Sequence, residues 1–315
     1  MGKHVIAGAG QVGTHLAELL RGQGHEVVVV TRSGSGPEGV TRIAADVGDQ
    51  ARLTEIARGA DALYNAVNPP YDKWAAAWPP MASSFLGTAE ATGAVLVTLS
   101  CLYGYGPVDG PMTEDLPMAA RGTKGRVRAR MWADALAAHR AGRIRMTELR
   151  GSDYYGPGAG DQAYLGDRFV PALLAGRRAF FLSDPGIPHS WTYLPDVARA
   201  LALAGTDERA WGRAWHVPSV PPLSALEMGR RLTRLAGAPE PRISELPRPL
   251  MNAAGLFSPL LREMRETRYQ FDRPYVLDSS AFETAFGMAP TPVGEGLKAV
   301  IAAEGREVSA VPAGK

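Results

Sequence analysis

Short apolar runs alternate with longer amphipathic stretches through the first half of this chain. The runs VVVV, within Glu26–Thr31, and VLVTL, at Val95–Leu99, are continuously apolar, as is typical of strands covered on both faces. The stretches between such runs carry apolar residues at helical spacing. This alternation predicts βαβ units, and therefore a parallel sheet with helices on both of its faces.

The pattern predicts elements at definite positions. Strands are expected at His4–Ala7, Glu26–Thr31, Thr41–Ala44, Ala62–Ala66, Val95–Leu99 and Arg145–Leu149. Helices are expected at Val12–Gln23, Ala51–Gly59, Trp74–Thr92 and Arg126–Ala141. After about Ser152 the alternation loosens, although Leu223–Ala236 and Ser279–Phe286 still have helical patterns. We therefore expect a dinucleotide-binding domain over residues 1–150. Over residues 151–315 we expect the last strands of the sheet, interleaved with a smaller substrate-binding lobe.

Composition and charge limit the class of protein. The chain has 315 residues, of which 45% are hydrophobic and 21% charged, as in ordinary globular enzymes. A net charge of +2 without a basic run favours neither nucleic acid nor membrane as a partner. Cys101 is the only cysteine, so an internal disulfide and a cysteine-based zinc site are excluded, and we expect no metal. Because the first expected strand begins almost at once, we expect no signal peptide and a cytoplasmic location.

A glycine motif, Gly8-x-Gly10-x-x-Gly13, lies between the first expected strand and the first expected helix. In a dinucleotide site the first glycine allows a tight turn, the second lets the backbone approach a pyrophosphate, and the third lets helix and strand pack closely. The pyrophosphate then binds backbone N–H groups at the helix N-terminus. The flanking elements favour this interpretation over a glycine turn that only packs. The expected contacts are Gly8, Gly10, Gln11, Val12 and Gly13.

The end of the second expected strand distinguishes NADP from NAD. NAD sites usually carry an acidic residue there, whereas NADP sites carry a cation for the 2′-phosphate. This strand runs into Thr31-Arg32-Ser33, which offers a guanidinium and two hydroxyls and no carboxylate. We therefore predict NADP rather than NAD, the alternative being that Arg32 is a solvated loop cation. Further along, Asp46 could accept a hydrogen bond from adenine, cap the next helix or belong to the turn before it.

Six segments follow the glycine motif in a characteristic order: Ala45–Asp49, Tyr64–Val67, Leu99–Gly104, Arg150–Gly158, His189–Ala198 and Trp215–Pro218. Together with the motif they resemble the extended short-chain dehydrogenase/reductase superfamily, in its NAD-dependent epimerase/dehydratase branch. The resemblance spans about residues 3 to 220, and it implies a Rossmann-type doubly wound sheet. The resemblance implies that Ser100 is the catalytic serine. It also implies cofactor contacts at Asp46, Val47, Ala66, Val67 and Ser100.

One part of the family's pattern is missing. The catalytic machinery of the family includes a Tyr-x-x-x-Lys pair on one face of a helix, about 25 residues after the serine. The corresponding positions here are Arg126 and Arg130. Arg130 could still hold ribose hydroxyls or a phosphate, and Arg126 could bind a carboxylate or an oxyanion. Neither can exchange a proton near neutral pH, because a guanidinium stays protonated. The alternative is that both belong to the solvated face of a basic helix.

Another group would then have to carry the proton. Tyr103 is the first candidate, because it follows Ser100 at the carboxyl end of a strand, where ligands bind in open α/β sheets. Tyr71 lies on the loop after the fourth strand, and His189 is the one histidine considered for proton transfer. Each is alternatively a packing or substrate-contacting residue. The expected substrate contacts are Asn68, Tyr71, Tyr103, Tyr154, His189 and Trp191.

Three functions follow from these observations. The first is an NADP-dependent oxidoreductase acting on a ketone or alcohol of a small or medium metabolite. The second is a redox-neutral epimerase, isomerase or dehydratase of the same family. The third, suggested by the missing pair, is an NADP-binding sensor or scaffold without catalysis. In each case we expect a small-molecule ligand and a monomer or homodimer.

Overall fold

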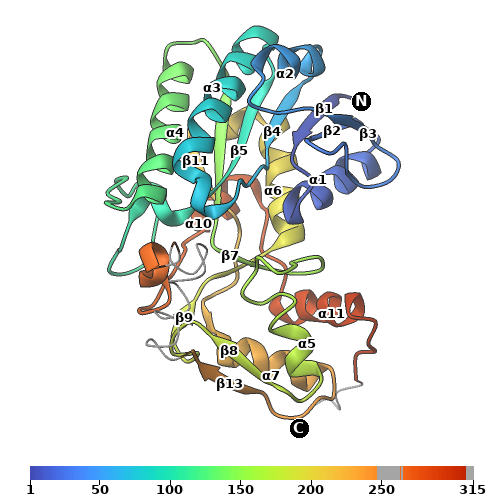
Figure 1. Cartoon of the computed structure of the whole chain (residues 1–315), viewed down its shortest axis with the longest axis vertical. Helices are drawn as coiled ribbons and strands as arrows, with labels where there is room; N and C mark the ends of the chain where they lie inside the picture. The colour runs from blue at the N-terminus through green and yellow to red at the C-terminus, as the bar shows by residue number, and fades with distance from the viewer. Residues whose placement is uncertain (247–262, 264, 310–315) are drawn as a thin grey trace. The chain divides into compact units, whose positions relative to one another are not determined.

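The computed structural model describes residues 1–246, 263 and 265–309 of the chain. The chain forms two compact units, each assembled from separate stretches of sequence (Figure 1). The first unit consists of Met1–Gly106, Glu114–Gly151 and Val197–Val217, and the second of Pro107–Thr113, Ser152–Asp196 and Pro218–Lys315. The chain therefore leaves the first unit three times, after Gly106, Gly151 and Val217, and returns to it at Glu114 and Val197.

The first unit is built on a seven-stranded parallel sheet. Its strands are β1 (Lys3–Ala7), β2 (Glu26–Thr31), β3 (Thr41–Ala44), β4 (Ala62–Asn65), β5 (Val95–Cys101), β6 (Met146–Gly151) and β11 (Ala214–His216). They lie in the order β11-β6-β5-β4-β1-β2-β3, so the direction of winding reverses between β1 and β4. This is the order of a doubly wound Rossmann-type sheet. The predicted fold class is confirmed.

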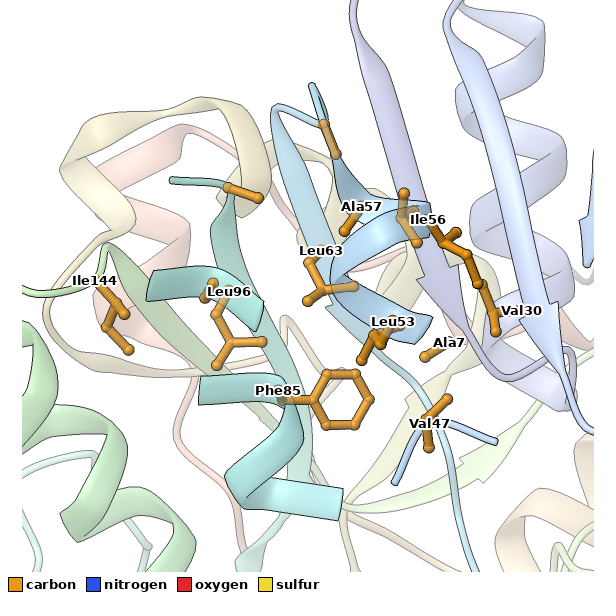
Figure 2. Packing of buried hydrophobic residues seen from close by; sticks show 14 of the residues in the cluster. Ala7, Val30, Val47, Leu53, Ile56, Ala57, Leu63, Phe85, Leu96 and Ile144 are labelled. Atoms are coloured by element: carbon orange, nitrogen blue, oxygen red, sulfur yellow. The ribbon is translucent and has the colours of Figure 1, made fainter. Parts of the chain in front are cut away.

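Helices cover both faces of this sheet. On one face, Leu53 of α2 (Gln50–Ala57) and Phe85 of α3 (Trp74–Thr92) pack in one core with Leu63 and Leu96 of the strands (Figure 2). Ala135 of α4 (Thr123–Arg140) belongs to the same core. Side chains alternate along a strand, so Ile6 and Tyr64 point to the opposite face. There α1 (Gln11–Gly22) packs Gly13 near Ile6, and α6 (Leu194–Thr206) places Gly205 against Tyr64.

Local patterns located most of these elements closely. β2, β3 and α3 have the predicted bounds. The prediction for α4 was wrong at its start, because the helix begins at Thr123 and not at Arg126. β5 continues to Cys101, since Ser100 pairs with Arg150 and Cys101 with Gly151 on the neighbouring strand. Strand pairing, which a local pattern does not contain, sets this boundary.

The second unit contains short strands and helices around a core of its own. Its elements are β7 (Asp153–Tyr155), α5 (Val170–Leu174), β8 (Arg178–Phe181), β9 (Pro188–His189), β10 (Trp191–Tyr193), β12 (Leu223–Ser224), α7 (Ala225–Leu235), β13 (Arg242–Glu245), α10 (Ser280–Phe286) and α11 (Val293–Ala303). β7 pairs with β10, β8 with β13, and β9 with β12. The predicted helices near Leu223–Ala236 and Ser279–Phe286 are confirmed as α7 and α10. A capping box of Ser224 and Glu227 starts α7. No helix within the described part of the chain is long and apolar enough to cross a membrane.

Candidate functional site

The three glycines of the motif have different surroundings. Gly8 has a φ of +100°, and a Cβ there would lie 2.7 Å from the carbonyl oxygen of Ala66. A Cβ on Gly13 would overlap the carbonyl oxygen of Gly8. Around a Cβ on Gly10 there is no atom within 4 Å among the described residues. The outer glycines are therefore required by packing, whereas the middle one leaves space above the loop.

The N-terminus of α1 fits an anionic ligand. Gly10 is the N-cap residue and provides no side chain, and the first turn of α1 contains no acidic residue. Such a terminus has backbone N–H groups without helical partners and a positive end of the helix dipole. Val12 packs into the core with 5% of its surface exposed, so only its backbone is available to a ligand. The space above Gly10 and the uncapped helix together have the form of a pyrophosphate site.

At the end of β2, the Thr31 hydroxyl donates to the carbonyl of Ser35 at 2.9 Å, and the Ser33 hydroxyl donates to that of Ser35 at 2.8 Å. Arg32 is exposed and has no hydrogen bond or ion pair with any residue that the structure describes. The two hydroxyls therefore shape the loop, and the guanidinium of Arg32 extends from it without a polar contact to any residue that the structure describes.

Asp46 and Val47 follow β3. The Asp46 carboxylate accepts a hydrogen bond from the backbone N–H of Gly48 at 2.8 Å, and the N-cap of α2 is Asp49, which accepts from Arg52 at 3.1 Å. Of the roles left open for Asp46, the turn is therefore observed and the N-cap is excluded. Val47 packs into the core beside Leu53.

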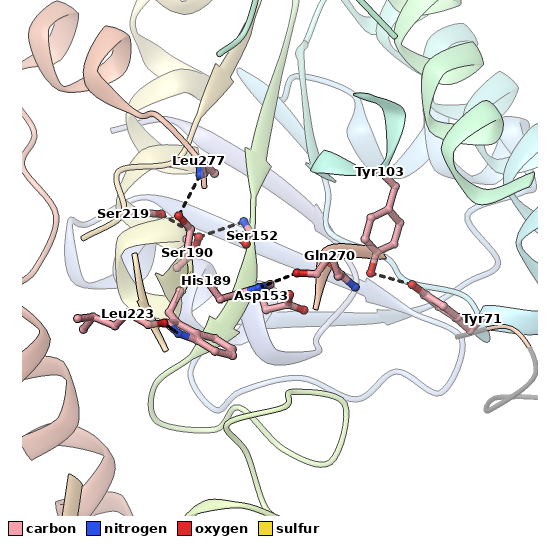
Figure 3. A network of polar contacts seen from close by, with 12 residues as sticks. Tyr71, Tyr103, Ser152, Asp153, His189, Ser190, Ser219, Leu223, Gln270 and Leu277 are labelled. Atoms are coloured by element: carbon pink, nitrogen blue, oxygen red, sulfur yellow. Dashed lines mark hydrogen bonds and ion pairs between the residues drawn. The ribbon is translucent and has the colours of Figure 1, made fainter. Parts of the chain in front are cut away.

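A group of aromatic side chains gathers after the neighbouring strands β4 and β5. Tyr71 belongs to the short helix η1 (Tyr71–Lys73), and Tyr103 to η2 (Leu102–Tyr105). The Tyr71 hydroxyl donates to the Tyr103 hydroxyl at 2.7 Å (Figure 3). The Trp74 ring lies 5.1 Å from the Tyr71 ring and 6.1 Å from the Tyr103 ring, measured between centroids. The Nζ of Lys124, a side chain that is almost fully buried, lies 4.7 Å from the centre of the Tyr71 ring.

Arg128 is a second buried cation beside these rings. Its guanidinium carbon lies 4.6 Å from the centre of the Trp74 ring and 4.3 Å from that of Trp78. Both distances are in the range of cation–π contacts. The tryptophans thus stabilise a charge inside the protein, and Arg128 in turn fixes the ring of Trp74 beside the two tyrosines.

A family model matches residues 4–217 of the sequence, and its description is NAD dependent epimerase/dehydratase family. The chain belongs to this family. Residues 4–217 include the glycine loop, the strand end at Arg32 and the aromatic group around Tyr103. They also include every strand of the seven-stranded sheet apart from the first residue of β1. The family is one of enzymes, so the predicted family and the prediction that the chain is an enzyme are confirmed.

Solved structures of epimerases and dehydratases share the fold. The Thermotoga maritima UDP-glucose 4-epimerase, solved with UDP-glucose, has a TM-score of 0.76 at 17% identity and covers 96% of this chain and 98% of its own. The Bacillus anthracis dTDP-glucose 4,6-dehydratase, solved with NAD, has a TM-score of 0.76 at 14% identity, with 97% of both chains covered. The enzyme WbmH of Bordetella bronchiseptica, solved with NAD+, has a TM-score of 0.70 at 21% identity. The match covers 96% of this chain and 98% of WbmH. No curated protein matches the sequence.

Within this epimerase/dehydratase fold, the residues of α4 divide between two faces. Arg126 and Arg130 are exposed, and they contact the carbonyl of Arg121 and the carboxylate of Asp134 respectively. Lys124 and Arg128 are buried one helical turn apart. The buried face carries Lys124, Arg128, Ala135 and Ala138, which have helical spacing. Because two of these positions are basic, the stripe is not apolar, and the sequence did not indicate that Lys124 and Arg128 are buried.

Ser100 lies near the end of β5 with 3% of its surface exposed, and its hydroxyl has no hydrogen-bond partner among the described residues. Cys101, the next residue, is half-buried and points to the opposite face of the sheet. Ala66 and Val67 lie half-buried on the loop after β4, and Asn68 is exposed there. The structure thus places Ser100 and this loop on adjacent strands, at the same edge of the sheet.

A buried polar network, which the sequence did not reveal, lies across β6 and β11. The Arg150 guanidinium donates to the Glu148 carboxylate and to the Tyr105 hydroxyl, both at 2.7 Å, and the Tyr105 hydroxyl is 2.7 Å from Nε2 of His216. Burial raises the pKa of Tyr105 to about 12, against the opposing effect of Arg150. Burial lowers the pKa of Arg150, but Glu148 and Tyr105 outweigh it and leave that pKa above its usual value. The Arg150 guanidinium therefore stays charged at neutral pH.

In the second unit, His189 is buried between two acceptors. Its Nε2 lies 2.7 Å from the Asp153 carboxylate and its Nδ1 lies 3.2 Å from the carbonyl of Gln270 (Figure 3). Trp191 is also buried, and its indole N–H donates to the carbonyl of Leu223. Tyr154 is half-buried on β7. His189 and Trp191 are thus part of the internal packing of this unit, whereas their predicted contact with substrate stays a prediction.

Proposed function

We propose that this chain is an NADP-dependent oxidoreductase of the epimerase/dehydratase family that acts on a carbonyl or hydroxyl group of a small metabolite. The observation that carries the proposal is the open space above Gly10 at an uncapped helix N-terminus, with Arg32 exposed at the end of the next strand. Backbone N–H groups of Gln11 and Val12 would bind the pyrophosphate. The guanidinium of Arg32, with its positive charge and paired N–H donors, matches a 2′-phosphate better than a 2′-hydroxyl.

When bound, the nicotinamide supplies or accepts a hydride. The protein has to orient the substrate and move a proton at its oxygen. The buried cations Lys124 and Arg128 lie on α4, over the rings of Tyr71 and Trp74. The half-buried phenol of Tyr103 follows the carboxyl end of the parallel strand β5. In open α/β sheets this edge binds ligands.

Family membership and the printed names of similar structures favour a second candidate, a redox-neutral epimerase or dehydratase. In that case the hydride removed from the substrate would return to it, and no cofactor would be consumed overall. Nucleotide sugars are then the substrate class to include, because UDP-glucose is bound in one of the similar structures.

The test has two parts. Titration of the protein with NADPH and NADH, followed by nicotinamide fluorescence, should give tighter binding of NADPH. Incubation with NADPH and a panel of ketones, aldehydes and UDP- and dTDP-sugars should then lower nicotinamide absorbance for at least one compound. Conversion of a sugar without net change in absorbance would favour the redox-neutral candidate. Tight cofactor binding without any conversion would favour an NADP-binding sensor.

A further inference from the structure

We propose that Tyr103 exchanges a proton with the substrate and that Tyr71 and Lys124 stabilise its phenolate, in place of the Tyr-x-x-x-Lys pair that α4 lacks. This inference rests on the proposed function, whose catalytic step it specifies. Three separate segments bring these side chains together: η1 after β4, η2 after β5, and the first turn of α4. The distances in sequence between Tyr71, Tyr103 and Lys124 do not by themselves indicate that these side chains lie together.

The direction of the Tyr71–Tyr103 hydrogen bond supports the assignment. Tyr71 is the donor and Tyr103 the acceptor, at 2.7 Å. A hydrogen bond to an ionised oxygen is shorter and roughly twice as strong as one between neutral groups. The bond from Tyr71 would therefore strengthen at the moment when Tyr103 loses its proton. Tyr71 is in this account a positioning residue, and Tyr103 is the residue that contacts substrate.

Lys124 supplies the positive charge that the phenolate requires. Its side chain has 1% of its surface exposed, and its Nζ lies over the Tyr71 ring. The phenols of Tyr71 and Tyr103 are half-buried, so water screens their interaction with this charge less than it would at the surface. Arg128 lies one helical turn further along and contacts Trp74, which borders both phenols. Within η1 itself, the charged groups are Asp72 and Lys73, which are exposed and pair with each other at 3.3 Å.

The reaction balances with two participants besides the protein and its substrate, a nicotinamide cofactor and water. In the reducing direction the O–H bond of Tyr103 would break as an O–H bond forms on the carbonyl oxygen of the substrate, and the carbonyl carbon would receive the hydride that a bound reduced nicotinamide supplies. Tyr103 is left as a phenolate, which takes a proton from water before the next turnover. In the oxidising direction the phenolate removes the proton of a substrate hydroxyl.

The first experiment compares Tyr103→Phe, Tyr71→Phe and Tyr64→Phe on a substrate found in the panel. Tyr103→Phe should lower kcat by about 100-fold or more, the usual contribution of a general acid. Tyr71→Phe should lower kcat about 10-fold, since it removes one hydrogen bond to a charged oxygen. Tyr64→Phe is the matched control, because Tyr64 is a buried phenol of the same unit that bonds to His4. It should leave kcat unchanged, and all three variants should bind NADPH like the wild type.

Two substitutions distinguish the effect of the Lys124 charge from the effect of its side-chain packing. Lys124→Met keeps the length of the side chain and removes its charge, so kcat should fall about 10-fold or more. Lys124→Arg restores a charge and should recover part of the loss. Wild-type turnover in Tyr103→Phe would overturn the inference while leaving the proposed function intact. Absence of NADPH binding in the wild type would instead overturn the proposed function.

A measurement without substrate completes the test. With 3-fluorotyrosine incorporated, fluorine NMR follows each phenol as the pH is raised, and Tyr103→Phe identifies the resonance of Tyr103. Ionisation of Tyr103 should move to higher pH in Lys124→Met and in Tyr71→Phe, because each loses a group that favours the phenolate. Tyr64→Phe should have no effect. If neither substitution changes the pH at which Tyr103 ionises, the inference is overturned, even if no substrate is found.

Discussion

Gly13 lies so close to Gly8 that a Cβ on Gly13 would overlap the Gly8 carbonyl oxygen, whereas a Cβ on Gly10 would meet no side chain or distant backbone of the described residues within 4 Å. One motif thus contains two kinds of glycine. The contact between Gly13 and Gly8 holds α1 against the end of β1, and Gly10 borders only open space.

The two kinds of glycine are expected to respond differently to alanine. Gly13→Ala should lower the free energy of unfolding by about 2 kcal/mol or more, because backbone has to move. Gly10→Ala should leave stability within about 1 kcal/mol of the wild type and weaken NADPH binding at least about 10-fold, because a methyl group then occupies the space proposed for the pyrophosphate. Urea unfolding and fluorescence titration measure the two effects.

Gly22→Ala is a matched control for Gly10→Ala. Gly22 lies at the other end of α1, and a Cβ there also meets nothing within 4 Å among the described residues. This variant should keep its NADPH affinity and gain up to about 1 kcal/mol of stability, as Gly-to-Ala changes in helices do. Equal NADPH affinities for Gly10→Ala and Gly22→Ala would argue against the proposed pyrophosphate site.

Arg32 is predicted to set the choice of cofactor. Arg32→Asp should weaken NADPH binding by at least about 10-fold and leave NADH binding unchanged or tighter, because a carboxylate repels a 2′-phosphate and accepts from a 2′-hydroxyl. Fluorescence titration with both cofactors measures the change. Arg58→Asp, an equal change of charge on an exposed residue after α2, should leave the ratio of the two affinities as it is. If Arg32→Asp also leaves the ratio as it is, NADP preference does not depend on Arg32.

His4 is predicted to make the protein less stable in mild acid. It is buried, with its ring 3.0 Å from the Tyr64 hydroxyl and 3.2 Å from the ring of His25. Burial, and next the charge of His25, lower the pKa of His4 to about 4 from the usual 6.5. The unfolded chain therefore binds more protons between these two values, so stability should fall as pH decreases from about 6.5 towards 4.

The loss attributable to His4 is on the order of 3 kcal/mol once pH is below both values. Urea unfolding between pH 8 and pH 5 should show the decline, and His4→Gln should reduce its slope whatever its effect at pH 8. A slope that His4→Gln does not change would assign the acid sensitivity to other groups.

The Arg150–Glu148 pair is predicted to be essential for stability. Glu148→Gln leaves the guanidinium buried with its charge uncompensated, so it should cost about 3–5 kcal/mol. Arg143 and Glu90 form an ion pair at 3.0 Å on the surface of the same unit, and Arg143→Ala should cost about 1 kcal/mol or less. Urea midpoints compare the two. Similar midpoints for both variants would mean that Arg150 is stabilised by other groups, such as the ring of Trp132 4.9 Å away.

The sequence by itself determined the doubly wound sheet, the glycine loop and the membership of the family. These depend on local information, because apolar runs, helical spacing and turn glycines act on neighbouring residues. The bounds of β2, β3 and α3 were predicted for this reason. The apolar run of β2 also predicted that Arg32 directly follows the end of this strand.

Tertiary structure alone decided which residues of α4 face the protein. A basic helix shows no clear apolar stripe when the buried positions themselves are Lys124 and Arg128. Their charges are tolerated because Tyr71, Trp74 and Trp78, from another part of the chain, contact them. The same holds for Tyr71 and Tyr103, which are 32 residues apart and share a hydrogen bond only because β4 and β5 are neighbours in the sheet. Long-range pairing of strands therefore created the candidate proton-transfer group, which no local pattern could contain.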